Sequence, residues 1–125
     1  MNNKLKEGET LFADGKFDEA EKFFLSLVEK DSDCKEAYNN LGVIAFQKDD
    51  KTKAIDYFTR SLEIDPLDRD TIVNYTNLLR SLDQLPIVIP LLEKIIEINP
   101  EDKEIIQLLD DIRSTPQPQS KIAIL

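Results

Sequence analysis

Histidine is absent from the 125-residue sequence, and cysteine occurs once, as Cys34. Without histidine, the chain cannot form a Ser-His or Cys-His catalytic pair or a metal site with histidine ligands. A single cysteine excludes an internal disulfide and a cysteine-rich zinc site. We expect the thiol to be a packed side chain rather than a nucleophile, because no histidine can activate it. The sequence therefore predicts no catalytic residue, no metal and no cofactor.

Bases are also few, with 16 Lys and Arg against 25 Asp and Glu and a net charge of −9. Proteins that bind nucleic acid or anionic membranes normally carry the opposite balance. The longest apolar stretch, Leu85–Leu92, contains two prolines and is far shorter than the ~20 residues of a membrane helix. No basic and then apolar leader opens the chain. We therefore expect a cytoplasmic, single-domain protein that binds neither nucleic acid nor membrane.

The sequence repeats with a period of 34 residues. Rows that begin at residues 1, 35 and 69 align without gaps, and several columns then hold the same or similar residues. A period of this length is typical of proteins built from stacked helix pairs. The matching columns are Gly8 and Gly42; Phe12 and Phe46; Ala20, Ala54 and Val88; Phe24, Phe58 and Leu92; Leu27, Ser61 and Ile95; Ile64 and Ile98; and Pro66 and Pro100.

Each row has the apolar spacing of two amphipathic helices. Small residues such as Gly42 let the two helices of a row approach closely. Asp50 is placed to cap the second helix of the middle row, and Pro66 ends that helix because proline cannot continue its hydrogen-bond ladder. Asp33 and Glu36 have the spacing of a capping box at the start of the first helix. The apolar positions of the middle row are Tyr38, Leu41, Ala45 and Phe46, then Ala54, Ile55, Phe58 and Leu62.

This pattern resembles the tetratricopeptide repeat family, whose period and signature it shares over residues 1–102. The first row has the expected turn at Gly15, and the third has Tyr75-Thr76 where the family usually has Leu-Gly. The resemblance implies an all-α, right-handed solenoid of three helix-turn-helix repeats. The residues that carry it are Tyr38, Leu41, Gly42, Ala54, Phe58, Ser61 and Pro66 in the middle row, Gly8, Leu11, Ala20, Phe24 and Leu27 in the first, and Leu92, Ile95 and Pro100 in the third.

The period divides the chain into repeats at 1–34, 35–68 and 69–102. An apolar stripe after Asp102 then predicts a capping helix over 103–113, and 114–125 are expected to be a linker and tail. In the third repeat, Pro86 and Pro90 fall at the start of the second helix. Because Pro90 removes a backbone donor about one turn in, we expect a helix with a distorted first turn.

The resemblance also implies that the first helix of each repeat lines a concave groove, which binds a peptide segment or another protein. Phe12 and Phe46 fit a half-buried core better than a role as peptide anchors. The groove candidates are Leu5, Glu9 and Phe12 in the first repeat, Asn39, Asn40, Val43 and Phe46 in the second, and Val73, Asn74, Asn77 and Arg80 in the third.

One class of groove is disfavoured by these positions. Some repeat adaptors hold the carboxyl terminus of a chaperone with a clamp of Lys, Asn and Arg. Asn40 matches the asparagine of such a clamp, but Leu5 and Glu9 stand at the basic positions of the first repeat. Asp70 and Asn74 stand at those of the third. The clamp is therefore incomplete.

Acidic residues are expected along the rim of the groove. Glu9, Glu36 and Asp70 should repel a carboxylate terminus, and a basic or amphipathic segment suits them better. Asn40 and Asn74 stand at equivalent positions and resemble the asparagine ladder with which some repeat domains hold a peptide backbone. We therefore expect a protein or peptide partner, more basic or amphipathic than acidic.

The end of the sequence leaves three functions open. After the polar segment Ser114–Ser120, Lys121–Leu125 is apolar enough to begin a buried parallel strand. It resembles the first strand of a nucleotide-sugar-binding domain, so the chain could be an accessory domain excised from an enzyme such as a glycosyltransferase. Alternatively it is a terminus that packs on a neighbour or stays loose. The leading expectation is a non-catalytic interaction module, and a further one is a scaffold that self-associates through its terminal helices.

Overall fold

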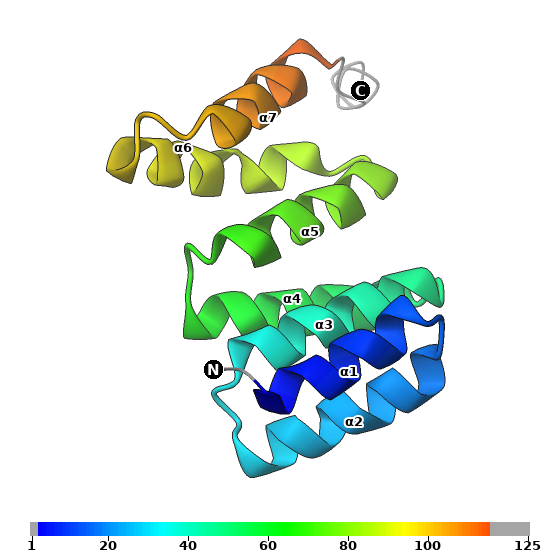
Figure 1. Cartoon of the computed structure of the whole chain (residues 1–125). Coiled ribbons are helices and arrows are strands. Elements are labelled where there is room, and N and C mark those ends of the chain that lie inside the picture. The colour runs from blue at the N-terminus through cyan, green and yellow to red at the C-terminus, as the bar shows by residue number, and fades with distance from the viewer. Residues whose placement is uncertain (1–2, 116–125) are drawn as a thin grey trace.

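The computed structural model describes residues 3–115, and within this range the chain is all-α (Figure 1), which confirms the expected fold class. Seven α-helices and one 3-10 turn follow one another, joined by short loops. They are α1 (Asn3–Ala13), α2 (Phe17–Lys30), α3 (Lys35–Gln47), α4 (Lys51–Ile64), α5 (Arg69–Ser81), η1 (Leu85–Val88), α6 (Ile89–Ile98) and α7 (Lys103–Ser114). Residues 116–125, and with them the predicted apolar tail, lie outside the described part.

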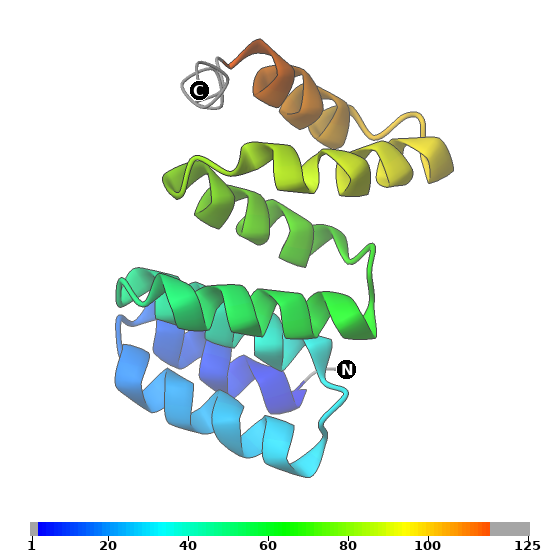
Figure 2. The same cartoon turned by 180° about the vertical axis from the view of Figure 1, so that it is seen from behind.

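The helices stack in sequence order as antiparallel pairs. We call α1–α2, α3–α4 and α5 with η1–α6 the first, second and third helix pairs. In Figure 1, α1 and α3 face the viewer, whereas Figure 2 shows α2 and α4 from the opposite side. This alternation places the first helix of each pair on one face of the stack and the second helix on the other.

Aspartate side chains cap the N-termini of α4, α5 and α7. The predicted cap of α4 is confirmed, since Asp50 Oδ1 accepts a hydrogen bond from the backbone N–H of Lys53 at 3.1 Å. Asp68 and Asp102 cap α5 and α7 in the same way. Each cap satisfies a backbone donor that the helix itself leaves free.

The predicted capping box at the start of α3 is wrong. The residue that precedes this helix is Cys34, whose side chain makes no capping hydrogen bond. Asp33 lies one residue further back, in a turn where its own N–H donates to Asp31 Oδ1 at 3.0 Å. The turn therefore uses the residue that the spacing assigned to the helix start.

Close contact between the helices of a pair depends on glycine. A Cβ atom on Gly42 would lie 2.5 Å from the buried ring of Phe58, and one on Gly8 would lie 2.5 Å from Phe24. Real side chains do not approach so closely, so both positions need glycine. The two phenylalanines fill the space and form the centre of each pair, as the 34-residue period predicted.

The third pair differs at its second helix. Pro86 lies in the first turn of η1, and Pro90 in the first turn of α6. Proline is tolerated there because the first N–H groups of a helix have no partner within it. The expected distortion is confirmed, and it takes the form of a separate 3-10 turn before the α-helix.

A closed ring of polar contacts joins the second pair to the third. The hydroxyl groups of Ser61 and Thr71 are fully buried and 2.9 Å apart. Thr71 donates to the carboxylate of Asp68, and the Ser61 hydroxyl also lies 3.1 Å from the backbone carbonyl of Lys35. The single hydrogen of Ser61 can therefore be donated either to Thr71 or to that carbonyl. The Lys35 ammonium lies 3.0 Å from the same carboxylate, which closes the ring. All four residues are thus held in one arrangement where α3, α4 and α5 meet.

Candidate functional site

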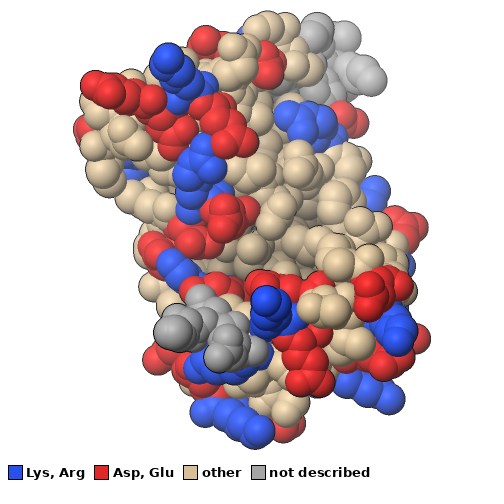
Figure 3. Space-filling model, viewed as in Figure 1, with Lys and Arg blue, Asp and Glu red and all other residues tan. Residues whose placement is uncertain are grey.

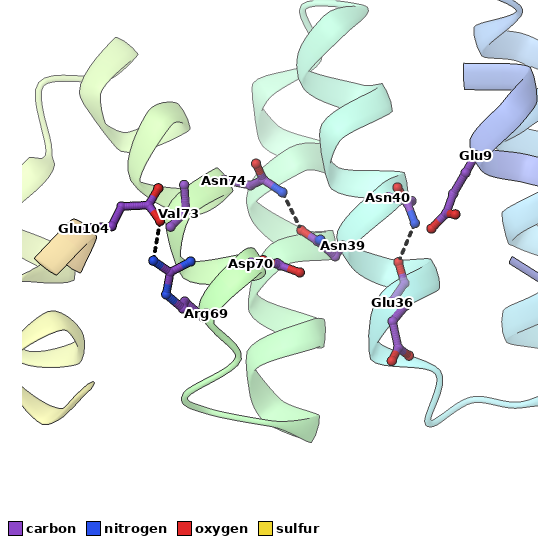
Figure 4. Close-up of a pocket in the computed structure, with 9 residues that line it drawn as sticks. All are labelled: Glu9, Glu36, Asn39, Asn40, Arg69, Asp70, Val73, Asn74 and Glu104. Carbon is purple, nitrogen blue, oxygen red and sulfur yellow. Dashed lines mark hydrogen bonds and ion pairs between the residues drawn. The ribbon is translucent and has the colours of Figure 1, made fainter. Parts of the chain in front are cut away.

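A cavity of about 360 Å³ opens on the face formed by the first helix of each pair (Figure 4). Side chains from α1, α3, α5 and α7 line it, although these helices are far apart in the sequence. Its lining is almost entirely polar. The lining residues are Glu9 from α1; Glu36, Asn39 and Asn40 from α3; Arg69, Asp70, Val73 and Asn74 from α5; and Glu104 from α7.

Four carboxylates and one guanidinium give the cavity a formal charge of −3. The guanidinium of Arg69 is already engaged, since its Nε donates to Asp102 Oδ2 at 2.9 Å and its Nη2 contacts Glu104. The hydrogen bond from Arg69 holds the pKa of the Asp102 carboxyl below its ordinary value. The positive charge of Arg69 is thus balanced by Asp102 and Glu104, and it does not offset the other three carboxylates of the cavity.

The other three carboxylates of the cavity have no basic partner. Within residues 3–115, Glu9, Glu36 and Asp70 form no ion pair. The nearby ammonium of Lys35 binds Asp65 and Asp68 instead. All three residues are exposed, so the cavity is an open region of uncompensated negative charge.

Three asparagine side chains line the cavity and form two hydrogen bonds. Asn74 Nδ2 donates to Asn39 Oδ1 at 3.0 Å, which links α5 to α3, and Asn40 Nδ2 donates to the backbone carbonyl of Glu36 at 3.0 Å (Figure 4). The residue that meets Asn74 is thus Asn39, not its equivalent Asn40. A side-chain amide has two donors and one carbonyl acceptor, so Asn39 and Asn74 keep hydrogen-bonding capacity that faces the cavity.

Charged side chains gather along one side of this face, where α3, α5 and α7 begin (Figure 3). Uncharged side chains cover the hollowed middle of the same face. Val43, Phe46 and Val73 are half-buried against the core. The face therefore combines a side where acidic and basic side chains are mixed with an uncharged middle.

Five of the eleven sequence-derived groove candidates line the cavity, namely Glu9, Asn39, Asn40, Val73 and Asn74. The other six lie elsewhere. Leu5 is only 3% exposed and packs in the core, because its helix turns this side chain toward α2 and α3 rather than the groove. Phe12, Val43 and Phe46 are half-buried against the core. Asn77 and Arg80 are exposed and hydrogen-bond to each other at 3.0 Å.

Two lining residues, Arg69 and Glu104, were not among the groove candidates or the expected rim. Both could have been found from the period. Arg69 stands 34 residues after Lys35, and Glu104 stands 34 residues after Asp70. A fourth row that begins at residue 103 therefore continues the alignment into α7, which the search for three rows did not include.

Two other kinds of site were sought in the described part of the chain. No group of three or more His, Cys, Asp or Glu side chains between residues 3 and 115 is placed to hold a metal ion. Among the same residues, no helix has the length and apolar character required to cross a membrane. The single cysteine, Cys34, is buried at the start of α3.

Solved structures with the same fold are numerous. MamA superposes with a TM-score of 0.71 and 27% identity over 85% of this chain, which spans 62% of MamA. The first repeat domain of Spaghetti (RPAP3), bound to the HSP90 peptide SRMEEVD, gives a TM-score of 0.76 at 17% identity and covers 89% of this chain and 90% of that one. YrrB, a repeat protein with an unusual peptide-binding site, gives 0.68 at 24% identity, with coverage of 82% and 53%.

No protein of curated function matches the sequence significantly. The matches above give no support to the glycosyltransferase alternative. A family model described as tetratricopeptide repeat matches residues 5–69, which is more than half of the chain. The chain therefore belongs to the tetratricopeptide repeat family.

Proposed function

We propose that this chain is a non-catalytic protein-interaction module, which binds a segment of a partner protein in the concave cavity. The observation that carries the proposal is the cavity itself, where polar side chains of four successive first helices converge on one open space. Proteins of this family typically bind proteins or peptides, and the Spaghetti domain is bound to a peptide in its structure. The repeats are proposed to be 1–34, 35–68 and 69–102, with 103–113 as a capping helix.

The charge of the cavity favours a basic or amphipathic partner. Glu9, Glu36 and Asp70 have no basic partner among the described residues, so a cationic side chain would gain favourable interactions there. A free carboxylate would meet repulsion instead. Apolar side chains of the partner can pack on Val73 and its neighbours in the uncharged middle of the same face. Asn39 and Asn74 can hold the backbone of the bound segment through their unused hydrogen-bonding groups.

Two labelled peptides of about twelve residues test this proposal. One alternates Lys or Arg with Leu and ends in an amide, and the other carries Glu in place of each base and a free carboxylate. We expect the full chain to bind the basic peptide more tightly, with an affinity that falls as salt is added because screening weakens the attraction. Fluorescence anisotropy across a salt series measures both affinities. Tight binding of the acidic peptide that weakens with salt would contradict the proposal.

Variants in which amides replace the carboxylates of the cavity test whether the peptide binds there. The double variant Glu36→Gln and Asp70→Asn removes two carboxylates from the cavity. We expect it to lower the affinity for the basic peptide about tenfold or more. The matched control is Glu29→Gln with Asp14→Asn, which removes the same charges from exposed positions outside the cavity. An equal loss in both variants would show that only the net charge of −9 attracts the peptide.

Self-association through the terminal helices stays a prediction of the sequence. Sedimentation over a concentration series tests it, and a monomer at every concentration would count against it.

A further inference from the structure

A second groove lies between α6 and α7 and shares no residue with the concave cavity. It has a volume of about 420 Å³, and its floor is formed by the apolar side chains of Ile96, Ile106 and Leu109. Asp110 and the ion pair between Glu93 and Arg113 form its rim. Unlike the concave cavity, this groove is mainly apolar at its base.

The 34-residue period explains why this groove exists. Ile106 corresponds to Tyr38 in α3 and to Ile72 in α5, and both of these are buried. α7 is the last helix within residues 3–115, and Ile106 is only half-buried. The groove is thus the place where the second helix of a further pair would lie.

The residues of α7 disfavour a helix at this place. Asp110 corresponds to Gly42, where even a single Cβ atom would lie 2.5 Å from Phe58 of the packed second helix. Arg113 corresponds to the buried Ala45. Thr76 and Leu79 stand at the same two positions in the third pair and are buried as well. Two charged side chains of α7 therefore occupy positions that are buried and uncharged under the packed second helices of the other pairs. A narrower, extended segment avoids them, since its side chains alternate between the floor and the rim.

We propose that residues Lys121–Leu125 of this chain occupy the groove as an extended segment. These residues lie outside the described part of the structure and enter the argument through their sequence alone. With Ile122 and Ile124 on the apolar floor, Lys121 faces the rim on the alternate side. Asp110 has no basic partner among the described residues, so the ammonium group has a free carboxylate to meet there.

The chain between α7 and this segment is long enough. Six residues, 115–120, separate the helix from Lys121, and an extended chain of six residues spans about 20 Å. The groove runs back along α7 from Arg113 to Ile106, which is about 10 Å at the rise of an α-helix. In the sequence, Pro116 and Pro118 disfavour continuation of the α7 helix.

Disulfide trapping in the full chain tests the proposal. In a Cys34→Ala background, Ala123→Cys is combined either with Asp110→Cys on the rim or with Asp111→Cys. Asp111 is also exposed and adjacent in sequence, but it does not line the groove. The two double-cysteine chains have the same composition and tether length. We expect the 110–123 disulfide to form about tenfold faster or more within a monomer, because docking raises the local thiol concentration above that of a free tether.

Further substitutions separate docking from chance collision. Ile122→Asp should remove the difference between the two rates, since a carboxylate cannot replace an isoleucine on an apolar floor. Equal rates for positions 110 and 111 would overturn the proposal. Disulfide-linked dimers as the main product would overturn it too and assign the groove to a second copy of the chain.

Discussion

The second and third helix pairs follow the same period but fill the same positions differently. In the second pair, Gly42 leaves room for the ring of Phe58, which is fully buried. In the third pair, Thr76 and Leu92 stand at these positions and are also fully buried. A larger residue on the first helix is thus matched by a smaller one on the second.

The two pairs therefore fill the space between their helices with different residue types. A change in side-chain size at one of the two facing positions is offset at the other. Thr76 gains a partner inside its own helix, since its hydroxyl donates to the carbonyl of Ile72 at 2.7 Å. That bond satisfies a buried polar group, which would otherwise destabilise the fold. The family model matches residues 5–69 and so ends where the third pair begins. The part of the chain it leaves out still adopts the same fold.

The largest expected effect comes from the aromatic centre of the second pair. Phe58→Ala should lower the free energy of unfolding by about 3–5 kcal/mol, because it empties a fully buried position between two helices. The ring also lies 6.1 Å from that of Tyr75, so its loss loosens the contact with the third pair. Urea unfolding measures the change. A loss under about 1 kcal/mol would contradict the predicted burial of this side chain.

Alanine should destabilise the chain more in place of Gly42 than in place of Thr76, which stands at the same position of the period. Gly42→Ala should destabilise the chain by about 1–3 kcal/mol, since its methyl group overlaps the Phe58 ring and outweighs the gain in helix propensity. Thr76→Ala fits the space already present, loses one hydrogen bond within the helix, and should change stability by about 1 kcal/mol or less. Thermal or urea unfolding of both variants tests the comparison. Similar costs for the two would mean that the close approach is not specific to the second pair.

Much of this architecture could be predicted from the sequence, because each helix buries a regular stripe of side chains. The period brought Phe24, Phe58 and Leu92 to one column, and all three are fully buried. The effect of Pro86 and Pro90 followed from the missing N–H groups alone. Predictions of this kind succeed where the physical cause lies within a few residues of its effect.

Details that depend on side-chain direction could not be read in the same way. Leu5 was carried over by position as a groove candidate, yet it points into the core. The capping box at Asp33 failed because a turn of the same residues competed with the helix start. In the cavity, the partner of Asn74 proved to be Asn39, which depends on how two helices cross. Such choices are made between elements, and a linear spacing does not record them.

The junctions before and after the third pair provide a second comparison. Ser61 and Thr71 hydrogen-bond at the junction of α4 and α5, whereas the equivalent positions between α6 and α7 are Ile95 and Ile105. The first junction is thus polar at its centre and the second apolar. Apolar packing does not depend on pH, so the two junctions should respond differently to acid.

Asp68→Asn tests the polar junction. Burial opposes ionisation of this carboxyl, but hydrogen bonds from Thr71 and Lys35 hold its pKa below the ordinary value of a free aspartate. Because the folded pKa is lowered, its stabilising effect is present above about pH 4 and is lost as the pH falls through the folded pKa. We expect Asp68→Asn to cost about 1–2 kcal/mol at pH 7, and the difference from the native chain to shrink as the pH falls through the folded pKa. Urea unfolding at a series of pH values measures it.

Asp102→Asn is the matched control at the apolar junction. Asp102 caps α7 as Asp68 caps α5, and Arg69 lowers its pKa through a hydrogen bond. No buried hydroxyl depends on Asp102, however, and its ion pair with Arg69 lies near the surface. Asparagine can keep the cap, so we expect a smaller loss of stability at pH 7 than for Asp68→Asn, with the same sign of pH dependence and a smaller amplitude. An equal pH-dependent change in stability for the two variants would show that the buried hydroxyl groups of Ser61 and Thr71 add nothing to the ion pair. The two junctions would then differ in composition but not in strength.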